Sequence, residues 1–521
     1  MVEEDSPSSS TDADKSADGG GEPPSDASSS PQPTGPDAEP NGGQPKVRLA
    51  YIAAIVVTAV VTILVVALLI NIFERRQEAI TFEDRVVDVD EDTVDPAIWG
   101  QNWPRQFDTY QRTVDYEQTR YGGSDAVPEQ KLDKDPWLRL MWAGYAFALD
   151  YREARGHAYM LIDQEQTERV LERPQPGACL HCHSAVMPAY RHVGDGDVME
   201  GFREVNAMGY TEARNLTDDD GELLIEHPVT CGDCHNPDTM ELRITRPAFL
   251  EGITDYMENV HDIEDYDVNE DATRQQMRSY VCAQCHVEYY FTHEDNQLIY
   301  PWSQGLDVDA QQQYYDDIDF ADWEHGYTGA DVLKAQHPEF ELFKQGPHAD
   351  AGVACADCHM PYEREGAVKF SNHHVRSPLL HMDQSCMTCH GGTEEQMLER
   401  VHTIQDRTQA MTDRASDALV AMMHEIVAAQ ESGATDEQLE QALEYQRKSQ
   451  WRVDWIYSEN SHGFHAPQES MRVLGDAIDY AHRGRSIAQE YSEIDFEDIE
   501  RVPEEIEAVT PADEAPPGIY E

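Results

Sequence analysis

The longest uninterrupted run of apolar residues lies near the N-terminus. Residues 49–70, LAYIAAIVVTAVVTILVVALLI, are apolar throughout and long enough to cross a bilayer as a helix. No small-residue cleavage site follows directly, which favours an uncleaved anchor over an ordinary signal peptide. We therefore predict a transmembrane anchor at 47–73. The polar composition on either side of it predicts a disordered acidic tail at 1–46 and an acidic linker at 74–98.

Near the C-terminus the apolar residues follow a helical period of three and four. A capping box at Thr393–Gln396 opens the first such stretch, and Gly433 suits its end. Its apolar stripe comprises Met397, Val401, Ile404, Met411, Ala415, Leu419, Met422 and Ile426. The pattern predicts long helices at about 394–431, 436–457 and 468–491, and a loose acidic tail at 493–521. The stripes are expected either to pack within the chain or to form a dimer seam.

The region between these ends, from about residue 99 to 393, has irregular spacing of apolar residues and many Gly, Pro and Asp turns. Alternating apolar and polar runs are few, which argues against a large sheet. The pattern therefore predicts a mainly α protein with little β-structure.

The charge balance is extreme. The chain has 38 Lys and Arg against 101 Asp and Glu, a formal net charge of −63. A surface of this sign repels nucleic acid, which is excluded as a partner. We interpret the excess of acids as the solvated surface of a protein adapted to high salt, and hence as a halophilic trait.

One short pattern, C-x-x-C-H, occurs five times, and we number its copies as motifs one to five. They are Cys179-Leu-His-Cys182-His183, Cys231-Gly-Asp-Cys234-His235, Cys282-Ala-Gln-Cys285-His286, Cys355-Ala-Asp-Cys358-His359 and Cys386-Met-Thr-Cys389-His390. The pattern is the attachment signature of c-type haem. On a helical turn its two cysteines and its histidine share one face, so two thioether bonds hold the porphyrin while the histidine reaches the iron.

Structural zinc and disulfides are the alternatives for these cysteines. Zinc sites give no reason for a histidine after every second cysteine, and disulfides would not repeat one spacing five times. The motifs use all ten cysteines of the chain. We therefore predict five covalent haem c groups and a multihaem cytochrome c with a haem-packed core at 99–492. Because c-type haem is attached outside the cytoplasmic membrane, we expect this domain to be extracytoplasmic.

Several longer strings carry a family resemblance. They are RGHAY at 155–159, CAQCHVEYYF at 282–291, KAQHPE at 334–339, CADCHMP at 355–361 and GFHAP at 463–467. In this order they resemble the ammonia-forming cytochrome c nitrite reductases, a pentahaem family. The resemblance covers about three quarters of the chain, from roughly Trp99 to Tyr491.

The resemblance implies an enzyme that reduces nitrite to ammonium with six electrons at haem one, whose iron keeps one axial position open. The catalytic residues it implies beside that haem are Arg169, Tyr289 and His337. Second axial ligands of the four other, electron-conducting haems would be His157, His348, His373 and His465. The implied calcium ligands are the Glu288 and Gln336 side chains and the carbonyls of Tyr289 and Lys334. Expected partners are a quinol-linked or small-cytochrome electron donor and a second copy of the chain in a homodimer.

Some readings stay open at this point. Many family members have lysine as proximal ligand of haem one, where this chain has His183, and His374 rivals His373 as a distal ligand. Arg169 also fits a surface ion pair with neighbouring glutamates. His181, inside motif one, is interpreted as a spacer. The alternatives for the whole protein are an electron conduit without substrate and a related reductase of hydroxylamine or sulfite.

Overall fold

The computed structural model describes residues 45–78 and 85–492 of the chain, which divides into one unit up to Ile80 and another from Thr81 onward. In the described part of the first unit, helix α1 (Pro45–Glu78) contains the apolar stretch Ala50–Ile70. This stretch is long and apolar enough to cross a membrane, although a signal sequence has the same character. The predicted tails, except for residues 45–46, and residues 79–84 of the predicted linker lie outside the described residues.

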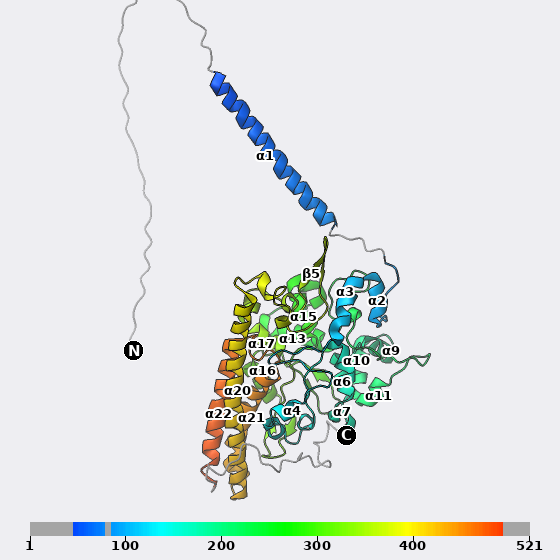
Figure 1. The fold of residues 1–521 in the computed structure, drawn as a ribbon. Coiled ribbons are helices and arrows are strands. Elements are labelled where there is room, and N and C mark those ends of the chain that lie inside the picture. The colour runs from blue at the N-terminus through cyan, green and yellow to red at the C-terminus, as the bar shows by residue number, and fades with distance from the viewer. Residues whose placement is uncertain (1–44, 79–84, 493–521) are drawn as a thin grey trace, which may run out of the picture. The chain divides into compact units, whose positions relative to one another are not determined.

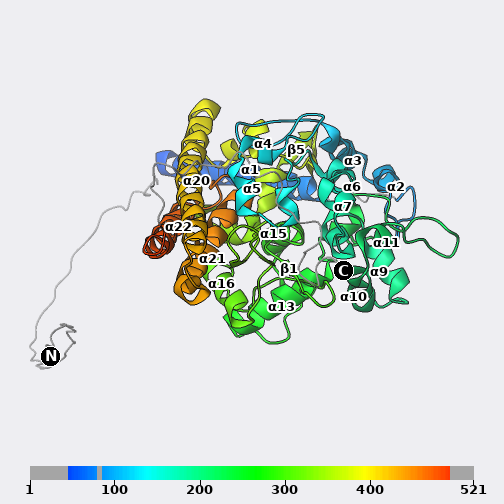
Figure 2. The same cartoon turned by 90° about the horizontal axis from the view of Figure 1, so that it is seen from below.

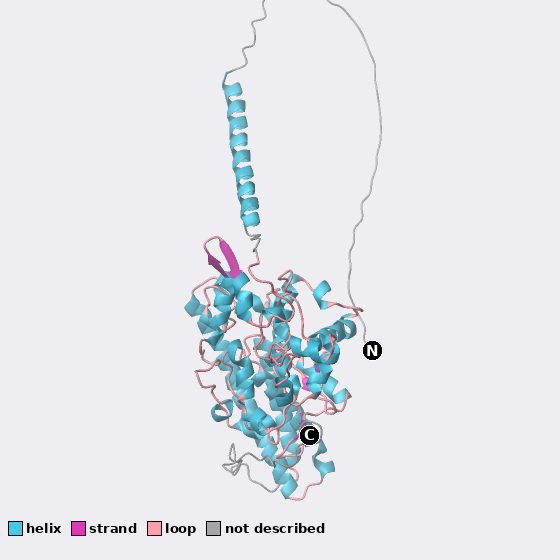
Figure 3. Ribbon diagram, turned by 90° about the vertical axis from the view of Figure 1, so that its right-hand side faces the viewer, coloured by secondary structure: helices cyan, strands magenta, loops and turns pink. Residues whose placement is uncertain are grey.

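The second unit is built mainly from short helices joined by turns (Figure 3). Its α-helices before the long C-terminal ones are α2 (Pro96–Asn102), α3 (Pro104–Tyr110), α4 (Lys131–Lys134), α5 (Trp137–Met141), α6 (Met160–Glu165), α7 (Glu168–Glu172), α8 (Leu180–His183), α9 (Met187–Val193), α10 (Val198–Ala207), α11 (Tyr210–Arg214), α12 (Cys231–Cys234), α13 (Pro247–His261), α14 (Val268–Asp271), α15 (Arg274–Ala283), α16 (Val308–Asp317), α17 (Glu339–Lys344), α18 (Pro347–Asp350) and α19 (Cys355–His359). The 3₁₀ turns are η1 (Gln111–Val114), η2 (Ala146–Ala148), η3 (His157–Tyr159), η4 (Gly177–Cys179), η5 (Pro378–Leu380) and η6 (Cys386–Thr388).

The strands of the described residues form only short antiparallel pairs. They are β1 (Tyr290–Phe291) with β2 (Leu298–Ile299), β3 (Trp323–Glu324) with β4 (Asp331–Val332), and β5 (Tyr362–Glu365) with β6 (Val368–Ser371). The predicted fold class, mainly α with little β-structure, is confirmed.

Three long helices run side by side along one flank of the second unit (Figures 1 and 2). They are α20 (Glu394–Glu431), α21 (Asp436–Ser458) and α22 (Pro467–Ala488). Capping boxes at Thr393 and Thr435 satisfy the first free backbone N–H groups of α20 and α21. Gly433, with φ +94°, reverses the chain between these two helices in a conformation that favours glycine.

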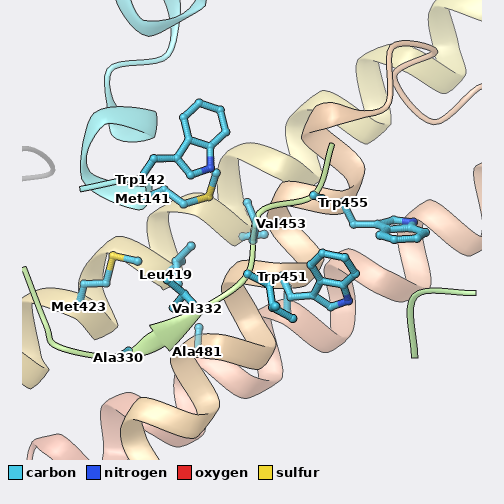
Figure 4. Packing of buried hydrophobic residues seen from close by; sticks show 14 of the residues in the cluster. Met141, Trp142, Ala330, Val332, Leu419, Met423, Trp451, Val453, Trp455 and Ala481 are labelled. Carbon is cyan, nitrogen blue, oxygen red and sulfur yellow. The ribbon is translucent and has the colours of Figure 1, made fainter. Parts of the chain in front are cut away.

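The apolar stripes of these helices bury a core of large side chains (Figure 4). Trp142, which follows α5, packs there with Trp451 and Trp455 of α21, and each of the three indoles is at most 1% exposed. Leu419 of α20 and Val332 of β4 belong to the same buried cluster. Intrachain packing thus accounts for this face of the helices, and the homodimer stays a prediction. A second apolar cluster, with Tyr190, Phe202, Phe249 and Trp302 among its members, lies under α8 to α13.

Candidate haem and catalytic site

Each C-x-x-C-H motif lies on a helical turn. Motif one spans η4 and α8, motif two forms α12, motif three ends α15, motif four forms α19 and motif five lies on η6. The histidine N–H donates to the carbonyl of the first cysteine in motifs two, three and five, at 2.9, 3.0 and 2.9 Å. This closes one helical turn and brings both cysteines and the histidine to the same face, which is the arrangement that haem attachment requires.

A single cavity of about 1460 Å³ is lined by all five motifs. All ten cysteines and all five motif histidines face it. Side chains from distant parts of the chain, among them His157, His348, His373 and His465, face it too. A cavity of this size, walled by thiols and imidazoles, fits several haem groups that would complete the core.

Four motif histidines each face one further histidine. The ring centres are 6.3 Å apart for His157 and His286, 6.2 Å for His235 and His373, 6.1 Å for His348 and His390, and 6.4 Å for His359 and His465. A metal–imidazole nitrogen bond is about 2 Å long, so two rings on opposite sides of one iron have centres about 6 Å apart. All four pairs have the spacing of a haem iron held by two histidines.

Hydrogen bonds at Nδ1 orient several of these imidazole rings. The Nδ1–H groups of His235, His359 and His373 donate to the carbonyls of Met240, Arg376 and Ser371, at 3.0, 3.0 and 2.9 Å. A carbonyl can only accept, so Nδ1 carries the proton and Nε2 is left to bind a metal. Burial lowers the pKa of His359 and His373 to about 4, which keeps both rings in the neutral, metal-binding form.

A carboxylate replaces the carbonyl behind His465. Glu459, fully buried, lies 2.6 Å from His465 Nδ1. Burial alone would lower the pKa of His465, but the glutamate outweighs it and the net shift is upward. His374, the rival of His373, turns elsewhere, with Nε2 3.4 Å from Glu117. His181, inside motif one, is buried against the Tyr190 hydroxyl at 3.1 Å.

Motif one differs from the other four. His183 donates from Nδ1 to the Met160 carbonyl at 2.9 Å, so its ring is oriented as the others are. Yet among the ring pairs of the described residues, no second histidine faces His183 at the spacing found for the other four. Arg169, Tyr289 and His337 line the shared cavity. Arg169 and Tyr289 lie close enough to Cys179 of motif one, and His337 close enough to His183, for each to affect the pKa of the other. The catalytic role of the three residues stays a prediction.

Among residues 45–78 and 85–492, no carboxylate is in direct contact with Arg169. Its guanidinium lies 4.1 Å from the centre of the Phe147 ring, and Nη2 donates to the Gln164 side chain at 3.4 Å. Nη1 is buried without a hydrogen-bond partner. Glu165, one of the neighbours in the surface ion-pair alternative, pairs with Arg214 instead. An aromatic face and an amide stabilise the cation without neutralising it, so the charge is available to an anion.

Burial shifts the pKa values of the two other residues, His337 and Tyr289. It lowers the pKa of His337 well below its usual value, and the neighbouring His286 and His183 add to the effect. It also raises the pKa of the Tyr289 hydroxyl, which stays protonated. An anion bound beside His337 would counteract the shift and favour the protonated ring.

Two of the predicted calcium ligands, Glu288 and Gln336, are in contact in the folded chain. Glu288 is fully buried, and its carboxylate accepts from the Gln336 N–H at 2.6 Å and from the Tyr315 hydroxyl at 3.0 Å. Burial raises its pKa well above the usual range, and two further buried acids, Asp322 and Glu341, add to the shift. Buried carboxylates beside amide and carbonyl oxygens are a donor set that fits a hard cation such as calcium.

Four supporting residues have no counterpart in the sequence predictions. They are Phe147 under Arg169, Glu459 behind His465, Asp454 beside Lys334, and Arg246 among motifs one to three. Asp454 of α21 accepts from the Lys334 ammonium at 3.0 Å and fixes the loop that contains Lys334 and Gln336. No spacing in the sequence links these residues to their partners, because each pair meets only in the folded chain.

The fold and the cavity define a multihaem c-type cytochrome, and comparison with known proteins makes the class specific. The cytochrome c552 family model matches residues 95–514. The chain is 36% identical to a cytochrome c-552 of Bacteroides fragilis over 436 residues, 82% of this chain and 83% of that protein. It is 38% identical to a cytochrome c-552 of Parabacteroides distasonis over 391 residues, 74% of each chain.

A solved structure is similar as well. The cytochrome c nitrite reductase of Desulfovibrio desulfuricans, described for two calcium sites in its catalytic subunit, superposes with a TM-score of 0.69 at 29% identity. The match covers 78% of this chain and 88% of that one. The chain belongs to the cytochrome c552 family, and the predicted resemblance is confirmed.

Proposed function

We propose that the protein is a nitrite reductase that converts nitrite to ammonium with six electrons at haem one. The observation that carries this proposal is the contrast among the motifs. Four histidines each face a second histidine at 6.1–6.4 Å, whereas among the described residues no second histidine faces His183 at that spacing, and Arg169, Tyr289 and His337 line the same cavity. An electron conduit has no use for an unpaired cationic side chain at one of its haems. The solved relative, which is a cytochrome c nitrite reductase, supports the same reading.

When bound by Cys179, Cys182 and His183, the haem would supply the iron at which nitrite binds and pass on the electrons for its reduction. Arg169 would hold the anion, because its planar guanidinium can donate to two oxygens at once and Nη1 has no other partner. The local positive charge draws an anion into a protein whose overall charge is −63. His337, once an anion favours its protonated form, would donate protons as oxygen leaves. Tyr289, protonated throughout, would donate a hydrogen bond.

The contacts among motifs support an order for electron delivery. Arg246 bridges Ser184, which follows motif one, and Gln284 of motif three. The Cys355 N–H of motif four donates to the Ser279 hydroxyl of α15, the helix that leads into motif three, at 3.2 Å. Motifs one, three and four therefore follow one another in space. The four histidine pairs would hold the conducting haems, so that electrons from a quinol-linked or small-cytochrome donor reach motif one through motif three.

We also propose a calcium site and a membrane location for the enzyme. Calcium bound by Glu288, Gln336 and the carbonyls of Tyr289 and Lys334 would fix the position of Tyr289 and the segment before His337. The apolar helix Ala50–Ile70 would anchor the protein, with the haem domain extracytoplasmic. We also propose five covalent haems, a homodimer and adaptation to high salt.

Steady-state assays with a reduced dye test this function directly. Wild type should consume six electrons for each nitrite and release ammonium. His337→Ala should lose roughly 10²–10⁴ in turnover, the scale for a general acid, and Arg169→Lys should also be strongly impaired because it lacks the planar fork. Arg214→Lys, a change at an ion pair with Glu165 outside the cavity, is the matched control.

Near wild-type turnover in His337→Ala and Arg169→Lys, with all haems attached, would place the pocket elsewhere. Parallel assays with hydroxylamine and sulfite decide between the alternatives. A higher kcat/KM for either of them than for nitrite would overturn the assignment of nitrite as the substrate.

A further inference from the structure

Arg246 is a buried cation at the junction of three haem motifs. It is the N-cap residue of α13, and only 1% of it is exposed. Its Nη2 donates to the carbonyl of Ser184, the residue that follows His183 of motif one, at 2.7 Å. Its Nη1 lies 2.9 Å from Asp233 Oδ1, inside motif two. Its backbone N–H donates to Gln284, inside motif three, at 3.0 Å.

Asp233 is the negative partner of this cation and is tied to motif two. Its Oδ2 accepts from the Thr230 N–H at 2.7 Å, as part of the capping box that starts α12. The carboxylate is therefore fixed against the turn that would hold haem two. Gln284 completes the junction, since its Oε1 also accepts from the Thr245 N–H at 2.8 Å.

The two charges act unequally on the motifs. The Arg246 guanidinium contacts the Ser184 carbonyl beside motif one, and the Arg246 backbone is held against Gln284 of motif three. The Asp233 carboxylate, by contrast, belongs to motif two and is bound to its helical turn. The buried pair is thus a dipole, with its positive end toward motifs one and three and its negative end toward motif two.

We propose that the Arg246–Asp233 pair is a positioning and potential-setting device that favours electron transfer from haem two toward haems three and one. This inference rests on the proposed function, because it assumes that haem one is the electron acceptor. An added electron is stabilised near a buried cation and destabilised near a buried anion, and in the protein interior such effects are weakly screened. Charge near a haem is one of the means by which a protein sets its reduction potential.

In this step the ferrous haem at motif two is oxidised to ferric and the ferric haem at motif three, then at motif one, is reduced. No bond is formed or broken. The external one-electron donor reduces haem two again. Arg246 and Asp233 keep their charges throughout and act only by lowering the energy of the electron on one side and raising it on the other.

A potentiometric titration of the holoprotein, followed by absorbance and electron paramagnetic resonance without nitrite, tests the proposal. Arg246→Gln should lower the midpoint potentials of haems one and three. Asp233→Asn keeps an oxygen for the Thr230 N–H but loses the charge, so it should raise the potential of haem two. A purely structural role would not give shifts of opposite sign. Arg246→Lys, which keeps the charge, should stay close to wild type.

Arg243→Gln is the matched control. Arg243 pairs with Glu91 and donates to the Gly232 carbonyl at 2.8 Å. Its hydrogen bonds to a haem motif within the described part of the chain are with motif two, so Arg243→Gln should leave haems one and three unchanged. Unchanged potentials in Arg246→Gln, or shifts of the same sign in Arg246→Gln and Asp233→Asn, would overturn the proposal. If Arg246→Gln does not retain its haems, the proposal is tested by Asp233→Asn alone, in which the midpoint potential of haem two should rise. Because nitrite is absent, these results are independent of whether the protein reduces it.

Discussion

Replacement of Asp454 by asparagine should weaken both the fold and the proposed calcium site. Four donors converge on this buried carboxylate. Oδ1 accepts from the Lys334 ammonium at 3.0 Å and the Ser458 hydroxyl at 2.9 Å, and Oδ2 accepts from the Trp142 indole and the Ala335 N–H, both at 3.1 Å. An amide has one oxygen, so its NH₂ group would face two of the donors.

The expected loss follows from the charge and from the unpaired donors. Lys334 and Asp454 are each at most 1% exposed, so Asp454→Asn leaves a buried ammonium without its counter-charge. Breaking a buried pair in this way costs roughly 3–5 kcal/mol. The Lys334 carbonyl is a proposed calcium ligand, and about 1.4 kcal/mol corresponds to a tenfold change in binding. If a third of this lost free energy destabilises the loop that contains Lys334 and Gln336, calcium affinity should fall about tenfold.

Calorimetric titration of calcium into chelator-treated protein, together with denaturant unfolding, measures both effects. Ser458→Ala is the control, because it removes one donor to Asp454 and one acceptor of the Lys334 ammonium but leaves the ion pair, so it should cost only about 1–2 kcal/mol. If Asp454→Asn binds calcium as wild type does and is no less stable than Ser458→Ala, the ion pair does not support the loop and the reasoning is wrong.

Two further predictions concern calcium and salt. Calcium chelation or Glu288→Ala should lower nitrite turnover at least about tenfold with every haem still attached. The control Glu324→Ala, at an exposed acid of β3, should not lower it. Active protein that contains no calcium in metal analysis would contradict this prediction. Because the net charge is −63, the melting temperature should rise steeply between low and molar salt as counterions screen self-repulsion, and a flat profile would remove the reading of salt adaptation.

The sequence could predict the features that depend on residues close to one another along the chain. The C-x-x-C-H spacing specifies a helical turn wherever it occurs, and the capping boxes at Thr393 and Thr435 mark the starts of α20 and α21. The mainly α fold follows from the same kind of pattern and is confirmed. The family resemblance also rests on short strings, and it points to residues that the folded chain does bring together, such as Glu288 with Gln336.

The contacts that arise only in the folded chain could not be predicted. Four histidine pairs join distant segments, and counting histidines does not reveal which motif lacks a facing partner. His373 and His374 are neighbours in sequence, but only the backbone course turns the first toward His235 and the second toward Glu117. Arg246 has an ordinary sequence context, and its role becomes visible only because motifs one, two and three meet around it in the folded chain.

Electron paramagnetic resonance of the ferric protein tests the central claim most directly. Four irons held between facing histidines should be low-spin, and the iron at His183, with one axial position open, should give a single high-spin signal that changes when nitrite or cyanide binds. A spectrum with only low-spin haems, unaltered by either anion, would contradict the account and leave an electron conduit in its place.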